Sequence, residues 1–198
     1  MLGNGLPGDW SWMTGFLGGG AFGFWMYFRD ATPRHIERWR DGADGERWTE
    51  KQLRRLEAAG WAAAHDLTAK YGNVDHLMIG PGGVFLLDSK NWFGDVHVQN
   101  GVATVTPRDN PDAAWSLPRL TNGLRGASAA NKEALEKLTG VRTWVQPVVV
   151  VWAPFEQRYI ESAGVYFIAG QALADWLRDR PSRLSPDAVA KIRGVLAV

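Results

Sequence analysis

The sequence predicts an α/β fold in which a central mixed β-sheet is flanked by helices. At 198 residues with 45% hydrophobic content, the chain is long enough for one domain with a single core and too short for two ordinary domains. Short strand-like segments follow one another between Trp61 and Thr106, and helical periodicity precedes and follows them. The nearly continuous β-branched segment from Val145 to Trp152 is typical of a central strand that is buried on both faces.

Helices are predicted where apolar residues recur at three- and four-residue steps. In the first helix, Glu46 precedes Leu53 and Leu56 on the face that must be buried, and Gly60 stops the helix. The last helix begins with Ser185 as N-cap, followed by a proline at the first helical position. Helices are expected over about 42–59 and 120–138, and two more close the chain.

Strands are predicted where β-branched and aromatic residues lie between turn signals. The dipeptide Asn100-Gly101 is the strongest short-range signal for a two-residue hairpin turn. Residues 107–119 carry three prolines and show no periodicity, which predicts a loop. The expected strands cover residues 61–67, 74–79, 84–92, 96–99, 102–106, 145–152 and 165–168.

The first 40 residues are predicted to form a leader, separate from a domain over residues 41–198. Within the leader, the segment 10–28 carries no charge and is about long enough to cross a bilayer core as a helix. Its glycines and tryptophans fit an interfacial or a soluble leader as well as a spanning helix. If the segment spans a membrane, the four arginines between positions 29 and 40 place the domain in the cytoplasm, anchored at the inner face of the cell membrane.

The composition excludes several classes of chemistry. The 22 basic and 21 acidic residues nearly cancel, so net charge alone indicates no partner. The absence of cysteine excludes disulfides, thiolate catalysis and cysteine-based metal sites. None of the four histidines has the spacing of a zinc-protease helix, and the sequence has no phosphate-binding glycine loop or serine nucleophile motif. Carboxylate and lysine chemistry remains.

A tight turn between two predicted strands brings two acidic side chains together. Pro81 supplies the fixed φ of the first central turn position, and Gly82 the permissive second position. With this two-residue turn, the strand register places Asp75 opposite Asp88. Directly opposed like charges on an antiparallel pair repel each other. A purely structural hairpin would avoid this arrangement, so the pair indicates a function.

The residues around this pair extend the prediction to a metal site. Asp88 and Lys90 share a strand face because side chains alternate, and the register places Asn73 opposite Lys90. Two carboxylates suit Mg²⁺ or Mn²⁺, and Glu46 on the preceding helix is expected to supply a third carboxylate or a contact through water. Lys90 would orient water and stabilise charge on a phosphate. The alternative is an ordinary surface salt bridge. His76 faces the other way, which favours a structural histidine over a ligand.

Four segments of the chain form a recognisable set. They are Gly42-Ala43-Asp44-Gly45-Glu46, Asn73-Val74-Asp75-His76-Leu77, Gly80-Pro81-Gly82-Gly83-Val84-Phe85 and Asp88-Ser89-Lys90-Asn91-Trp92-Phe93-Gly94. Together they resemble the nuclease-related domain (NERD) family, which is grouped with the PD-(D/E)xK restriction-endonuclease-like nucleases. The resemblance covers about positions 40 to 152 and reaches more loosely to the C-terminal helix. It implies a restriction-endonuclease-like core.

Carried over residue by residue, the resemblance implies that Glu46, Asp75, Asp88 and Lys90 form the catalytic set. The three carboxylates would hold Mg²⁺. Gln146 lies where some relatives carry a glutamine near the site, so it is expected to contact substrate.

Asn73, Asn91 and Trp92 are also expected to contact substrate, and packing is the alternative for Trp92.

Three functional hypotheses stay open on the sequence. The first is a phosphodiester hydrolase that acts on DNA through water activated by Mg²⁺. The second is a membrane-tethered nucleic-acid-binding or scaffolding module that keeps the nuclease fold without turnover. The third is an unrelated α/β interaction domain. The sequence has no helix-turn-helix or zinc-finger pattern, which predicts weak base specificity.

Overall fold

The computed structural model describes residues 34–69 and 72–196. Residues 41–198 form one compact unit. The uncharged segment 10–28, considered above as a membrane segment, lies outside the described residues. Among the helices within the described ranges, none has the length and apolar character needed to cross a membrane.

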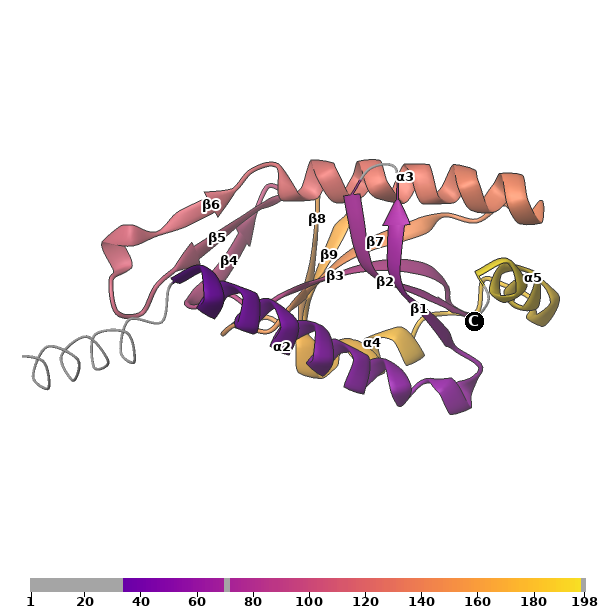
Figure 1. Cartoon of the computed structure of the whole chain (residues 1–198), viewed down its shortest axis with the longest axis horizontal. Helices are drawn as coiled ribbons and strands as arrows, with labels where there is room; N and C mark the ends of the chain where they lie inside the picture. Colours follow the sequence, from indigo (N-terminus) through magenta and orange to yellow (C-terminus); the bar gives the residue numbers. More distant parts are fainter. Residues whose placement is uncertain (1–33, 70–71, 197–198) are drawn as a thin grey trace, which may run out of the picture. The chain divides into compact units, whose positions relative to one another are not determined.

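A six-stranded mixed sheet forms the centre of this unit (Figure 1). Its first three strands pair as an antiparallel meander, and the third pairs in parallel with a strand from later in the chain. The predicted mixed sheet flanked by helices is therefore confirmed. In spatial order the strands are β1 (Ala62–Ala69), β2 (Gly72–Gly80), β3 (Gly83–Lys90), β7 (Val145–Val151), β9 (Val165–Ala169) and β8 (Tyr159–Ser162).

A second, three-stranded sheet contains β4 (Asp95–Gln99), β5 (Val102–Thr106) and β6 (Trp115–Leu117). The hairpin turn between β4 and β5 has φ angles of 50° at Asn100 and 77° at Gly101, as the dipeptide predicts.

Two strands were missing from the sequence prediction. β6 lies inside the predicted loop 107–119, after a 3₁₀ turn over Pro111–Ala113, and β8 is an edge strand. Both have three or four residues and are partly or fully exposed, so they lack the hydrophobic pattern by which strands are recognised. Their pairing with β5 and β9 supplies the strand conformation.

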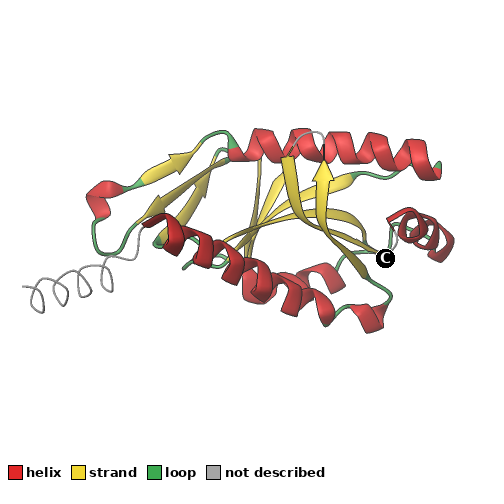
Figure 2. Ribbon diagram, viewed as in Figure 1, coloured by secondary structure: helices red, strands yellow, loops and turns green. Residues whose placement is uncertain are grey.

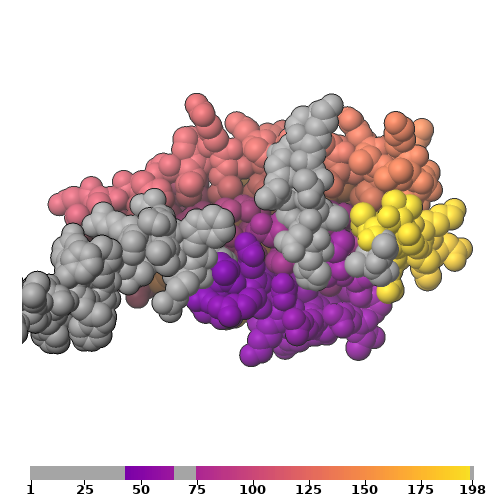
Figure 3. Space-filling view, in the orientation of Figure 1, coloured from indigo at the N-terminus to yellow at the C-terminus, as the bar shows by residue number. Residues whose placement is uncertain are grey.

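Helices cover both faces of the large sheet. From Asp41 onward α2 (Arg34–Arg54) lies along one face together with α4 (Leu173–Arg178), and α3 (Leu120–Thr139) and α5 (Pro186–Leu196) lie along the other (Figures 1 and 2). The surfaces of α3 and α5 adjoin each other (Figure 3). Strand alternation divides the core accordingly, with Phe85 and Leu87 beneath α2 and α4, and Val84 and Leu86 beneath α3 and α5.

The helix ends follow the sequence signals except in the first helix, which begins at Arg34 and not near residue 42. Gly140 ends α3 in the left-handed conformation, and Ser185 Oγ accepts the amide of Ala188 at 3.2 Å at the start of α5. The first helix ends at Arg54 rather than near residue 59, because a separate 3₁₀ turn over Glu57–Ala59 precedes Gly60.

The turn between β2 and β3 is the predicted two-residue turn, since Gly80 pairs with Gly83. The positive φ falls on Gly83, at 133°, and not on Gly82 as predicted. Glycine is needed at position 82 for space, because a Cβ there would lie 2.7 Å from the Cβ of Arg180. The carbonyl of Pro81 accepts the amide of Arg183 at 2.7 Å. The segment after α4 thus holds the turn in place.

Close packing at Gly80 predicts an effect on stability. A Cβ at this position would overlap the indole of Trp61, which is 5% exposed and has little room to move. Gly80→Ala should therefore lower the free energy of unfolding by about 1–3 kcal/mol. The control is Gly123→Ala in α3, where no atom lies within 4 Å, and it should raise stability by about 0.5–1 kcal/mol. Urea unfolding of both variants measures the difference. Equal stability of the two would contradict the packing argument.

Candidate active site

The candidate site lies where β2 and β3 stop pairing. Their ladder runs from Gly80 opposite Gly83 to His76 opposite Leu87, which is the predicted register. Asp75 and Asp88 are the next residues on the two strands. Beyond the last pair, the amide of Ser89 donates to Asp75 Oδ2 at 2.8 Å. A side-chain carboxylate therefore occupies the place that a β2 backbone carbonyl holds elsewhere in the ladder.

Asp88 and Lys90 lie together on one face of β3, as the alternation of the strand predicts. Lys90 Nζ is 2.7 Å from Asp88 Oδ1. The side chains of Lys90 and Asp88 are 32% and 16% exposed, so this pair is largely shielded from water. It differs in this respect from the exposed surface salt bridge that was the alternative, and it is less screened by solvent.

Burial raises the pKa of the Asp88 carboxyl above its ordinary value of 3.8. The positive charge and the hydrogen bond of Lys90 act against this shift, and the negative charge of Asp75 adds to it. The effect of Asp75 indicates that the two carboxylates are close enough to repel each other. Ionised Asp88 is therefore incompletely compensated by the protein, and a further positive charge at this position would be favourable.

The other face of β3 is fixed to α2 by a buried hydroxyl network. Thr49 is fully buried, and its Oγ1 donates to the carbonyl of Gly45 at 3.0 Å. The same oxygen lies 2.8 Å from Ser89 Oγ and 2.8 Å from Trp152 Nε1, and both donate to it. Ser89 points away from Asp88, as predicted, and this network uses its side chain to hold the end of β3.

Glu46 does not complete a cluster of three acidic side chains with the two aspartates. Its side chain is exposed, and α2 covers the face of the sheet opposite to Asp88 and Lys90. Among the described residues, no three histidine, cysteine or acidic side chains lie close enough to hold a metal ion. A Cβ built on Gly45 would lie 3.2 Å from the Cβ of Asn91, so Glu46 lies near the end of β3 without completing a cluster of three carboxylates.

The remaining predicted contacts have mixed outcomes. The prediction that Asn73 lies opposite Lys90 is wrong, because the ladder between β2 and β3 ends at His76 opposite Leu87, before it reaches these residues. On their other sides, Asn73 pairs with Thr68 of β1 and Lys90 with Val151 of β7. Trp92 is partly buried and packs against the core beneath the small sheet, which is the packing alternative stated above.

Gln146 and His76 lie away from the aspartates. Gln146 pairs with Phe85, three residues before Asp88, and its side chain lines a pocket at the other end of the strand. The structure therefore does not place Gln146 beside Asp75 and Asp88. His76 is 3% exposed and occupies the opposite face of β2, as expected for a structural histidine.

Sequence reasoning missed Thr49 and Trp152, which position the end of β3. A hydroxyl side chain on the buried face of the first helix is a weak signal for such a role, because the helix also carries many polar residues toward solvent. The indole of Trp152 is likewise expected only to pack. Its partner is fixed by tertiary contact between segments about 100 residues apart.

Comparison with known proteins identifies the family. The model of the nuclease-related domain (NERD) matches residues 41–152, which is more than half of the chain. The chain belongs to this family. NERD is part of the restriction-endonuclease-like superfamily, and the mixed sheet between helices agrees with that fold. No curated protein and no solved structure matches the chain. The NERD match includes most of the first helix, the hairpin and β7, and it indicates a nuclease-like function.

The hydroxyl network can be tested through Thr49. Replacing Thr49 by valine keeps the shape of the side chain but leaves Ser89 Oγ and Trp152 Nε1 without their shared acceptor. Thr49→Val should lower the free energy of unfolding by about 2–4 kcal/mol, because buried polar groups lose their partner. Thr104→Val, which removes an exposed hydroxyl pair with Ser116, should stay within about 0.5 kcal/mol of wild type. Urea unfolding measures both variants. Similar decreases in the free energy of unfolding would show that the buried network stabilises the fold no more than the exposed hydroxyl pair does.

The raised pKa of Asp88 predicts a pH-dependent stability. The folded chain holds the Asp88 proton more tightly than the unfolded chain, so stability falls as pH rises from near 3.8 through the raised pKa. An amide in place of this carboxyl cannot ionise, so in a chelator-containing buffer the stability of Asp88→Asn relative to wild type should increase over this pH interval. Urea unfolding across the pH series measures this difference in stability, with substitution of the exposed Asp175 by asparagine as the control. A constant difference between Asp88→Asn and wild type across that interval contradicts the shift.

Proposed function

We propose that this NERD-family protein is a metal-dependent phosphodiester hydrolase that acts on DNA. The observation that carries the proposal is the arrangement at the end of β3. Lys90 Nζ lies 2.7 Å from Asp88 Oδ1. The amide of Ser89, the residue between Asp88 and Lys90 in the chain, donates to the Asp75 carboxylate. This arrangement falls within the segment that matches a nuclease-related family.

The donor set suits a hard divalent cation. Carboxylate oxygens are the ligands that Mg²⁺ and Mn²⁺ prefer, and Mg²⁺ commonly takes one or two carboxylates with water and substrate phosphate completing its shell. Asp75 and Asp88 would hold the ion. The raised pKa of Asp88 fits this role, because a cation there would offset both the burial and the charge of Asp75. When bound, such an ion polarises the phosphate and lowers the pKa of a coordinated water.

The protein side chains would then act on the substrate in defined ways. Asp75 accepts the amide of Ser89 through Oδ2, so its other oxygen would be available to a metal ion. Lys90 is largely shielded and anchored through Asp88, so its ammonium would stabilise negative charge that develops on a bound phosphate. Glu46 is exposed on α2, next to Gly45, which lies near Asn91 just after β3. From this position it would act through water.

DNA is proposed as the substrate because the family is nuclease-related and because DNA supplies the phosphodiester bonds that the proposed hydrolysis would cleave. The phosphate backbone is common to all DNA sequences, and contacts to it carry no sequence information. We therefore propose weak base specificity, in line with the absence of a base-reading motif in the sequence.

Cleavage assays test this function. The full chain should release product from single-stranded or branched DNA in Mg²⁺ or Mn²⁺, and a chelator should abolish release. Asp88→Asn and Lys90→Met should each lower the rate by about 100-fold or more, as expected for groups that stabilise the transition state. The control Asp175→Asn removes a carboxylate of α4 that forms surface ion pairs with arginines, and it should cleave like wild type.

Two outcomes would overturn the proposal. Equal cleavage by wild type and Asp88→Asn would show that the product arises elsewhere. Salt-sensitive DNA binding with no product in any metal would favour the binding module without turnover. Circular dichroism of each variant confirms that it is folded before its rate is interpreted.

A further inference from the structure

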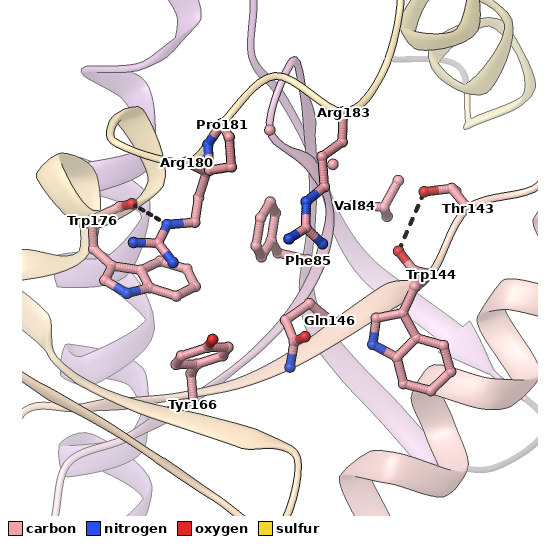
Figure 4. A pocket seen from close by; sticks show the side chains of 12 residues that line it. Val84, Phe85, Thr143, Trp144, Gln146, Tyr166, Trp176, Arg180, Pro181 and Arg183 are labelled. Carbon is pink, nitrogen blue, oxygen red and sulfur yellow. Dashed lines mark hydrogen bonds between the residues drawn. The ribbon is translucent and has the colours of Figure 1, made fainter.

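A pocket lies at the turn end of β3, away from the two aspartates. Its cavity of about 110 Å³ is bounded by the β2–β3 turn, the start of β7 and the segment that follows α4 (Figure 4). The floor is aromatic. Trp176 contacts Phe85 with ring centroids 5.6 Å apart and Tyr166 at 4.9 Å. A rigid apolar floor of this kind resists collapse, so the polar groups around it keep their positions.

The charged groups that line the pocket are two arginines, Arg180 and Arg183. The guanidinium of Arg180 lies over the Trp176 ring at 4.3 Å, and its Nε donates to the Trp176 carbonyl at 3.2 Å. The guanidinium of Arg183 extends into the middle of the cavity (Figure 4). Within the described part of the chain, neither arginine forms an ion pair. The pocket therefore presents two cationic groups whose donors are largely unused.

Acidic and titratable groups nearby do not cancel this charge. Burial raises the pKa of the Tyr166 hydroxyl, and the neighbouring Glu161 raises it further, while Arg180 and Arg183 act in the opposite direction. Tyr166 is thus a neutral hydroxyl at physiological pH. Glu161 is exposed on β8 and does not line the cavity. The pocket is suited to an anion.

The side chain of Gln146 gives the pocket a second kind of polar group. Its Nε2 donates to the carbonyl of Gly164 at 3.1 Å and to that of Pro147 at 3.3 Å. Because both partners are acceptors, the amide nitrogen faces them, and no hydrogen bond to Oε1 is formed among the described residues. An acceptor in the pocket lining is therefore left for a ligand, in addition to the two guanidinium donors. A simple inorganic anion would leave it unused, whereas a ligand with a hydroxyl or amino group beside its anion would use both.

The rim of the pocket carries an exposed indole. Trp144 is 49% exposed and lines the same pocket as Gln146, two residues along the chain (Figure 4). Exposed aromatic rings next to cationic grooves stack nucleic-acid bases, and such stacking tolerates any base. The pocket thus combines a cationic cavity of phosphate size, an acceptor and a stacking surface.

We propose that this pocket binds the phosphate of a nucleotide, with the base on Trp144. Arg183 and Arg180 bind the phosphate oxygens, and Gln146 Oε1 accepts a hydrogen bond from the sugar or base. Guanidinium groups match phosphate geometry through paired donors. The phosphate is supplied either by a free mononucleotide or by the terminal phosphate of a DNA strand, since both present the same chemistry. Asp75, Asp88 and Lys90 do not line this pocket, so nucleotide binding there does not depend on DNA cleavage.

Calorimetric titration of the full chain in chelator tests the proposal, with adenosine 5′-monophosphate as the probe. Adenosine and inorganic phosphate should each bind at least about tenfold more weakly than the nucleotide. Arg183→Gln should weaken nucleotide binding about tenfold or more, because a charge-assisted contact is lost. Trp144→Ala should weaken it about fivefold or more through loss of stacking. The control Arg55→Gln removes an exposed arginine of the segment after α2 and should bind like wild type.

The outcomes separate this proposal from the nuclease proposal. Asp88→Asn should bind the nucleotide like wild type whether or not the protein cleaves DNA. Competition by a 5′-phosphorylated oligonucleotide, and not by its 5′-hydroxyl form, assigns the site to strand ends; competition by neither assigns it to free nucleotides. Absence of nucleotide binding, unchanged binding in Arg183→Gln, or equal binding of nucleotide and inorganic phosphate would overturn the proposal.

Discussion

The candidate active site depends on a difference between the two neighbours of β3. β3 stops pairing with β2 before it ends, but it pairs with β7 up to its last residue. Its pairing with β2 stops at Leu87, whereas its pairing with β7 continues to Lys90 opposite Val151. The carbonyl of Lys90 also accepts the amide of Trp152 at 2.8 Å. The backbone is therefore fixed on the β7 side while the β2 side is open. The Asp75 carboxylate enters this opening, and a fully paired hairpin would leave no place for it.

Electrostatics at this opening argue against a structural role for Asp88. The strand is buried and hydrophobic up to Leu87, and Asp88 follows without a change of direction. Burial and Asp75 make its ionised form costly, and Lys90 compensates only in part. Buried ion pairs can often be replaced by apolar residues without loss of stability. Two carboxylates and one ammonium are a costly choice for stability at this place, which favours function as the explanation.

Local patterns predicted the hairpin, and tertiary contacts decided the rest. The Pro81-Gly82 turn length and strand alternation were enough to place Asp75, Asp88 and Lys90. The register did not show where pairing stops, so Asn73 was placed opposite Lys90 in error. Helical periodicity located the first helix but not the sheet face that it covers, so the position of Glu46 relative to the aspartates did not follow from the sequence. The short strands β6 and β8 exist only because a neighbour pairs with them.

Strand alternation places Asp88 and Lys90 on one face of β3, and it also helps to separate this candidate active site from the arginine pocket at the turn end. Phe85 and Lys90 stand on opposite faces of β3, and the strand between Val84 and Lys90 spans roughly 20 Å at its usual rise. A single phosphate cannot contact both ends. The aspartates would bind a cation, whereas Arg180 and Arg183 attract an anion, so the two sites also select opposite charges. Loss of one would leave the other intact, because the turn is held through the Pro81 carbonyl and the far end through β7.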